Sequence, residues 1–207
     1  VDNQGGCNMI RRKYSAIQLD ALAEVGNIGA GNAATALSQM INRKVNMSVP
    51  AVNIVRFNEI FDTQESEERV ISVIVRVLGD TPGNILFIFD DETANNMIEL
   101  LTGKKEDKFS ELGYSVLCEI GNIIAGSYMN AIAKFTNLLI LPSVPAVADD
   151  MLGAILSTTF IESEQFNDDV LDIETIFQND DDIKIGGHFY YVPKPGSLEK
   201  ILSALGV

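Results

Sequence analysis

Histidine and cysteine are scarce in this sequence, which contains one histidine, His188, and two cysteines, Cys7 and Cys118. Such a set cannot supply a Cys/His metal cluster or a disulfide framework. We therefore expect no metal site, and we expect Cys118 to be a buried, reduced thiol. The sequence also contains no phosphate-binding P-loop and no serine nucleophile elbow. These absences exclude the enzyme classes that depend on such sites.

Positive charge is also in short supply, because 15 lysines and arginines face 29 aspartates and glutamates. The formal net charge of −14 would repel nucleic acids and anionic membranes, so we expect neither as a partner. We find no signal peptide and no apolar run long enough to cross a bilayer. We therefore expect a cytoplasmic protein without membrane insertion, whose negative surface suits a locally basic protein partner.

The length and composition predict one domain. The chain has 207 residues, of which 46% are hydrophobic, and this is enough for one sizeable core. The first residues lack any periodic pattern, so we expect residues 1–10 to be a flexible leader or a remnant of cloning. The domain is then expected to cover residues 11–207.

One stretch of the chain occurs twice, and it organises the rest. Its centre reads EVGNIGAG from Glu24 and EIGNIIAG from Glu119, and Pro50 recurs as Pro145 at the same offset of 95 residues. Two copies of one element indicate a duplication. We therefore predict repeat 1 over about residues 14–104 and repeat 2 over about residues 109–207.

Each repeat is predicted to contain a long helix, several strands that pair mostly antiparallel, and a short helix. Ser15 and Gln18 form a capping-box pattern for a first helix that ends near Asn42, and Ser110 begins a second one that ends near Phe135. The strands are expected at residues 44–49, 52–57, 70–78, 85–89, 138–141, 170–177 and 183–192, and the shorter helices at 91–101, 149–162 and 197–205. The fold class is therefore α+β, with a pseudo-twofold axis between the repeats.

Three glycines interrupt the first long helix, namely Gly26, Gly29 and Gly31. Each should cost about 1 kcal/mol relative to alanine in a helix interior. Close internal packing is the expected reason for most of them.

Both long helices carry the same polar stripe. Asp20, Glu24 and Asn27 are spaced i, i+4, i+7, and the same positions of the second helix hold Ser115, Glu119 and Asn122. At about 100° per residue, each set lies on one narrow face that should point to solvent. A single exposed Glu and Asn would usually be only a solvated face. Their identity in two diverged copies instead favours a site in each.

These residues suit phosphoryl transfer without a nucleophile of their own. An asparagine carboxamide can orient a water molecule, and a carboxylate can bind a lysine on a partner. Hydrolysis of a phosphorylated partner depends mostly on such positioning when that partner brings its own metal ion and acyl phosphate.

The repeated pattern [DS]-x3-E-x2-N-x22-P resembles the CheC–CheX–FliY family of chemotaxis phosphatases, and within it the CheC branch with two sites. The resemblance covers the chain from about Tyr14. It implies hydrolysis of the aspartyl phosphate of the response regulator CheY, with no cofactor beyond the Mg²⁺ that phosphorylated CheY would carry. It implies that Asn27 and Asn122 orient the attacking water, and that Glu24 and Glu119 pair with a lysine of CheY. The supporting positions of the motif would be Asp20, Ser115, Pro50 and Pro145.

The resemblance also implies a second partner, the receptor deamidase CheD, which would dock on the helix expected at residues 149–162. The residues assigned to that docking surface are Asp149, Met151, Leu152, Ile155 and Leu156. Ordinary core packing is the alternative for this helix. For the whole protein, one alternative is a non-enzymatic adaptor that regulates CheD or sequesters phosphorylated CheY. A weaker alternative is a structural component of the flagellar switch, in which we would expect the Glu/Asn pairs to have been lost.

Overall fold

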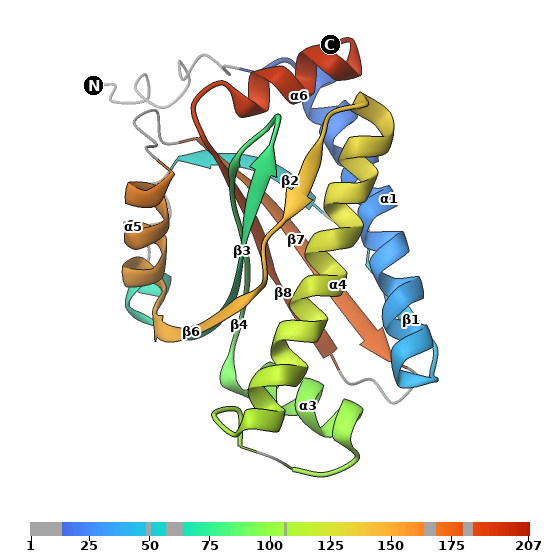
Figure 1. Ribbon diagram of the computed structural model, residues 1–207, viewed down its shortest axis with the longest axis vertical. Helices are drawn as coiled ribbons and strands as arrows, with labels where there is room; N and C mark the ends of the chain where they lie inside the picture. Colours follow the sequence, from blue (N-terminus) through green and yellow to red (C-terminus); the bar gives the residue numbers. More distant parts are fainter. Residues whose placement is uncertain (1–13, 49–50, 57–63, 106, 164–168, 180–183) are drawn as a thin grey trace, which may run out of the picture.

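The computed structural model describes residues 14–48, 51–56, 64–105, 107–163, 169–179 and 184–207 (Figure 1). Its helices are α1 (Ala16–Ile41), α3 (Asp91–Thr102), α4 (Glu111–Thr136), α5 (Leu152–Glu162) and α6 (Ser197–Leu205), with a short 3-10 helix at Gln64–Glu67. Its strands are β1 (Val45–Met47), β2 (Ala51–Arg56), β3 (Arg69–Gly79), β4 (Gly83–Phe89), β5 (Ile140–Pro142), β6 (Ala146–Met151), β7 (Asp169–Asn179) and β8 (Lys184–Pro193). The predicted α+β class is confirmed. The leader expected at residues 1–10 lies outside the described residues.

The sheet is antiparallel at every pairing between the described strands, and its order is β1-β7-β8-β4-β3-β5. Two further strands lie along the same edges, because β2 also pairs with β7 and β6 also pairs with β3. In register, Val73 of β3 lies opposite Phe87 of β4 and Val147 of β6. The strand order is therefore symmetric about its centre. The first strand of each half pairs with the third strand of the other half, β1 with β7 and β5 with β3. This arrangement is consistent with the predicted pseudo-twofold axis, which stays a proposal.

Helices cover both faces of the sheet. Helices α1 and α4 lie side by side over one face, and α5 lies on the other (Figure 1). The larger core fills the space beneath α1 and α4 and includes Leu37, Leu117 and Ile124. A smaller core beneath α5 joins Leu156 and Phe160 to β4, β7 and β8. The outer surfaces of α1 and α4 remain exposed to solvent.

Local signals fix the ends of both long helices. The Ser15 hydroxyl accepts a hydrogen bond from the Gln18 amide at 3.2 Å, and the Gln18 side chain accepts one from the Ser15 amide at 2.9 Å. This is the predicted capping box. Helix α4 begins in a similar way at Ser110. Both helices end at an asparagine in the left-handed region, Asn42 with φ 54° and Asn137 with φ 56°.

Two glycines allow close packing of the long helices, but the expectation that packing explains most of Gly26, Gly29 and Gly31 was wrong, because only Gly29 of these three has a close contact. A Cβ on Gly29 would lie 3.0 Å from Cα of Tyr128, so this glycine brings α1 against α4. A Cβ on Gly121 would lie 2.3 Å from a methyl group of Val73, so α4 lies directly on β3. Gly26, the equivalent of Gly121 in the first repeat, has only ordinary contacts, the nearest being Val52 at 3.5 Å.

The structure corrects the helix predicted at residues 149–162. Helix α5 begins at Leu152, and Asp149 and Met151 belong to strand β6, which was not predicted. Asp149 is held on this strand by cations that are distant in sequence, so its charge does not mark a helix start. The second half therefore repeats β1 and β2 as β5 and β6, 95 residues later, and α5 follows as an insertion.

One described helix bears on the expectation that no apolar run is long enough to cross a bilayer. Of the described helices, α4 is long and apolar enough, by length and composition alone, to cross a membrane. Half of its most apolar window is buried within the protein, as in the core helix of a globular domain.

The equivalent glycines Gly26 and Gly121 should respond oppositely to alanine. Gly121→Ala should lower the free energy of unfolding by about 2 kcal/mol, because its Cβ would overlap Val73. Gly26→Ala should raise it by up to about 1 kcal/mol, because helix propensity improves without overlap. Urea unfolding curves of the two variants provide the measurement. Equal effects would contradict the difference in packing between the two helices.

Candidate functional site

Five of the six residues in the two polar stripes are exposed to solvent, as the spacing predicts. On α4, Ser115, Glu119 and Asn122 are all exposed. On α1, Asp20 and Glu24 are exposed. Each candidate site therefore has its residues on a single helix, whose inner side is packed against the sheet and the other long helix.

Asn27 differs from the other members of the stripe because it is partly buried. Its side-chain Oδ1 is fully covered and finds no hydrogen-bond partner among the described residues. A buried polar atom without a partner costs about 1–3 kcal/mol. Exchanging the two amide atoms would leave the nitrogen in the same position, so either orientation leaves a covered polar atom. Asn122, at the equivalent position, is exposed. The two copies thus present the same amide differently.

The second copy shows how its proline segment lies beside the helix. The Cys118 thiol donates a long hydrogen bond, 3.8 Å, to the carbonyl oxygen of Pro145. Cys118 is partly buried, and burial raises the pKa of its thiol against the opposing effect of Tyr114. The neutral thiol thus links the segment before β6 to helix α4. Pro50 of the first copy lies outside the described residues.

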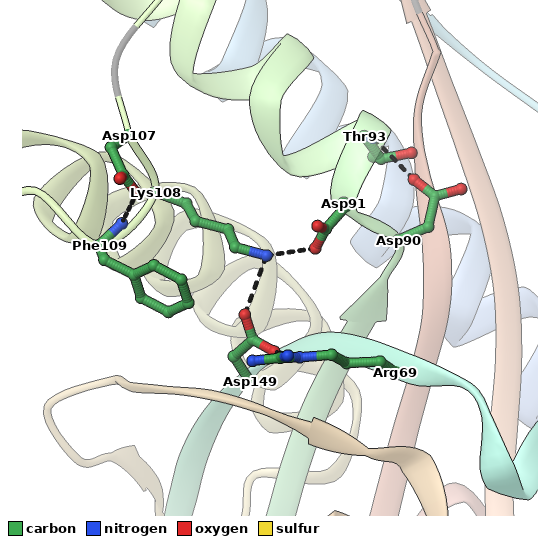
Figure 2. Close-up of polar contacts among 8 residues, drawn as sticks. All are labelled: Arg69, Asp90, Asp91, Thr93, Asp107, Lys108, Phe109 and Asp149. Carbon is green, nitrogen blue, oxygen red and sulfur yellow. Dashed lines mark hydrogen bonds and ion pairs between the residues drawn. The ribbon is translucent and has the colours of Figure 1, made fainter.

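A cluster of charged side chains surrounds Asp149, and we call Arg69, Asp91, Lys108 and Asp149 the Asp149 cluster (Figure 2). The Asp149 carboxylate lies 2.5 Å from Nε of Arg69 and 2.9 Å from Nζ of Lys108. Lys108 also pairs with Asp91 at the start of α3. The cluster joins β3, α3, β6 and the segment between the two halves. The Asp149 side chain is only 6% exposed, so its charge interacts with Arg69 and Lys108 rather than with solvent.

Opposing effects set the ionisation of Asp149. Burial favours the neutral acid, but hydrogen bonds and charge attraction from Lys108 and Arg69 outweigh it. They hold the pKa of Asp149 below its ordinary value of 3.8. The carboxylate is therefore charged at neutral pH and stabilises the folded state.

The apolar residues assigned to CheD docking mostly lie in the core. Leu152, Ile155 and Leu156 are 6%, 5% and 0% exposed, beneath α5. Their burial matches the alternative of ordinary core packing. Met151 is 52% exposed and stays available on the surface.

Comparison with known proteins places the chain in a family. A model of the CheC-like family matches residues 17–54 and 112–148, the two segments that contain the repeated stripe. The CheY-P phosphatase CheC of Bacillus subtilis (strain 168) is 38% identical over 91% of this chain and 94% of its own length. The chain belongs to the CheC-like family.

Other relatives of this CheC-like chain include motor proteins. The flagellar motor switch phosphatase FliY of B. subtilis is 27% identical over 64% of this chain, which spans 36% of FliY. The crystal structure of Thermotoga maritima FliY has a TM-score of 0.75 at 22% identity, covering 94% of this chain and 98% of that chain. At this identity the structural likeness shows the fold alone.

Sequence reasoning missed Arg69 and Lys108 as partners of Asp149. Arg69 begins β3, 80 residues before Asp149, and Lys108 belongs to a segment read only as a charged linker. Their pairing with Asp149 depends on tertiary structure, because β3 of the first half lies beside β6 of the second half only in the folded sheet. No spacing within the sequence signals it.

Replacing Asp149 by asparagine should destabilise the protein at neutral pH and reduce its sensitivity to acid. A carboxyl whose folded pKa is depressed stabilises the fold above its unfolded pKa, about 3.9, and loses that effect as pH falls through the folded value. Asp149→Asn should therefore lose about 2 kcal/mol at pH 7 and progressively less below pH 4. Urea unfolding at pH 7 and pH 3.5 measures this. The control Asp150→Asn, at the exposed neighbour, should change little, and an equal loss at both pH values would disprove the ionic role.

Proposed function

We propose that this chain hydrolyses the aspartyl phosphate of a CheY-type response regulator. The observation that carries the proposal is the pair Glu119 and Asn122, solvent-facing, about one turn apart on α4 and repeated as Glu24 and Asn27 on α1. The near full-length similarity to a CheY-P phosphatase supports the same reaction. Nucleophilic side chains are not needed for it, because positioning supplies most of the catalysis in phosphoryl transfer.

In the proposed mechanism, the asparagine side chain enters the acidic pocket of the regulator. The carboxamide of Asn122 holds a water molecule in line with the bond between phosphorus and the aspartate oxygen. The water oxygen attacks phosphorus, that bond breaks, and the regulator's aspartate leaves as a free carboxylate. The proton lost by the water goes to the released inorganic phosphate or to solvent. Any Mg²⁺ in this step belongs to the regulator, where it would neutralise charge on the phosphoryl oxygens.

The remaining motif residues would fix how the regulator docks. Glu119 is exposed and can pair with a lysine at the regulator's active site, which sets the register of the two proteins. Ser115, one turn earlier, extends the polar contact. Pro145, held near the helix by Cys118, shapes the surface beside it. We propose that Glu24, Asp20 and Pro50 do the same for the first site.

The difference between Asn27 and Asn122 ranks the two sites in this proposal. An asparagine that must reach into another protein works best when its amide is exposed. Asn122 meets that condition, whereas the covered Oδ1 of Asn27 must first be uncovered. We therefore propose that the second-half site contributes more of the activity.

The decay of phosphorylated CheY provides the direct test. Asn122→Ala should slow the stimulated decay more than Asn27→Ala, and the double variant should return it to the spontaneous rate, a loss of about 100-fold. Asn32→Ala is the matched control, because Asn32 is exposed on α1 but lies off the stripe. Full activity in the double variant would show that the sites are assigned wrongly. Wild-type protein that binds phosphorylated CheY without hastening its decay would favour the adaptor alternative.

We propose that CheD binds the exposed side of α5, with the end of β6. Ile161 and Met151 are 79% and 52% exposed, so this edge offers apolar surface without opening the core. Both lie outside the Glu/Asn stripes, so CheD could bind without occupying either one.

Changing Ile161 should separate binding of CheD from phosphatase activity. Ile161→Glu should weaken CheD binding about tenfold or more, because it places a charge in an apolar contact, and should leave decay of phosphorylated CheY unchanged. Calorimetric titration with purified CheD gives the affinity. Unchanged affinity would remove α5 from the docking surface. Thr158→Glu, at an exposed polar position of the same helix, tests whether added charge alone weakens binding.

A further inference from the structure

Each polar stripe continues beyond the residues of the motif, toward the start of its helix. Ile17 precedes Asp20 by three residues, and Leu112 precedes Ser115 by three, so the two apolar residues are equivalent in the two repeats. At about 100° per residue, both lie only about 20° beyond the edge of the arc that their own stripe spans. They are 68% and 44% exposed. Large exposed apolar side chains thus recur next to both sites.

Each stripe also continues toward the end of its helix, where it holds a glycine. Gly31 follows Asn27 by four residues, and Gly126 follows Asn122 by four, within the same arc. A Cβ built on Gly126 meets no atom of the described structure within 4 Å, and one on Gly31 meets only the sulfur of Met47 at 4.0 Å. Both have ordinary helical backbone, since neither is among the residues with positive φ.

Packing among the described residues does not explain these glycines. Gly29 and Gly121 sit against Tyr128 and Val73, where a methyl group would overlap neighbouring atoms. Gly31 and Gly126 have room for one, yet each keeps the helix less stable than alanine would. The same residue type at the same distance from the asparagine in both copies points to a requirement outside the chain.

We propose that Ile17 and Leu112, with Gly31 and Gly126, are specificity-determining residues that seat the phosphorylated response regulator on each stripe. The apolar side chain would cover an apolar part of the regulator's surface on one side of the Glu/Asn pair. The glycine, on the other side, leaves clearance for a loop of the regulator to approach the helix backbone. A flat surface one turn past the asparagine lets that side chain reach deeper into the regulator's pocket. The inference rests on the proposed function and adds the residues that hold the substrate protein.

A test on the second-half site uses protein that already carries Asn27→Ala, so that one site is measured. Leu112→Ser should raise the KM for phosphorylated CheY about tenfold and leave kcat unchanged, because a docking contact acts equally on the ground and transition states. The control is Phe135→Ser, because Phe135 is 46% exposed on the same helix and lies off the stripe. It should leave KM unchanged.

Gly126→Ala gives a second, independent reading. It should raise the urea midpoint, because alanine favours the helix and meets no neighbour, yet lower kcat/KM about tenfold. Affinity for CheY activated by beryllofluoride should fall in both variants, and this readout does not depend on catalysis. If the parent protein hydrolyses the phosphate and both variants match it in KM and affinity, the inference fails and the proposed function stands. Wild-type protein that binds activated CheY without hydrolysing its phosphate sinks the proposed function alone.

Discussion

The pairing of each half's first strands with the other half is the constraint on which the structure depends. Strands β1 and β2 of the first half lie along β7, and β5 and β6 of the second half lie along β3. Neither half can complete its sheet alone, because these backbone groups would be left without partners. Helices α1 and α4 lead directly into the exchanged strands. The exchange therefore places both helices over one face of the same sheet, where they meet at Gly29 and Tyr128.

This arrangement decides which parts of the long helices remain for function. The inner side of α1 and α4 is taken by the sheet and by the other helix, so only an outer arc reaches solvent. The repeated Glu/Asn pairs lie on that arc. The two helices do not sit alike, since Gly121 presses α4 onto Val73 while Gly26 makes only ordinary contacts. Equal sequences can therefore give unequal sites, as the exposed Asn122 and the partly buried Asn27 show.

The sequence alone predicts the features that depend on neighbours in the chain. The capping box at Ser15, the ends of both long helices, strands β3 and β4 and the exposed Glu24 and Glu119 follow from residues within a few positions of one another. Strand β6 could not be predicted in this way. Its two adjacent aspartates are typical of a helix start, and Asp149 is tolerated on the strand because Arg69 and Lys108 neutralise it. Those partners come together only after the halves have exchanged strands.

Three residues that cost the fold stability lie on the proposed docking surface. Asn27 keeps a covered oxygen without a described partner, and Gly31 and Gly126 weaken helices in places where alanine would fit. Proteins usually retain such costs where function requires them. The comparison of the two copies and the packing of the structure are separate observations, and both lead to the same arc of α1 and α4. A solvated helix face explains exposed charge, but it explains neither the glycines nor the covered amide. Docking of a substrate protein accounts for the glycines and gives the amide a reason to be retained.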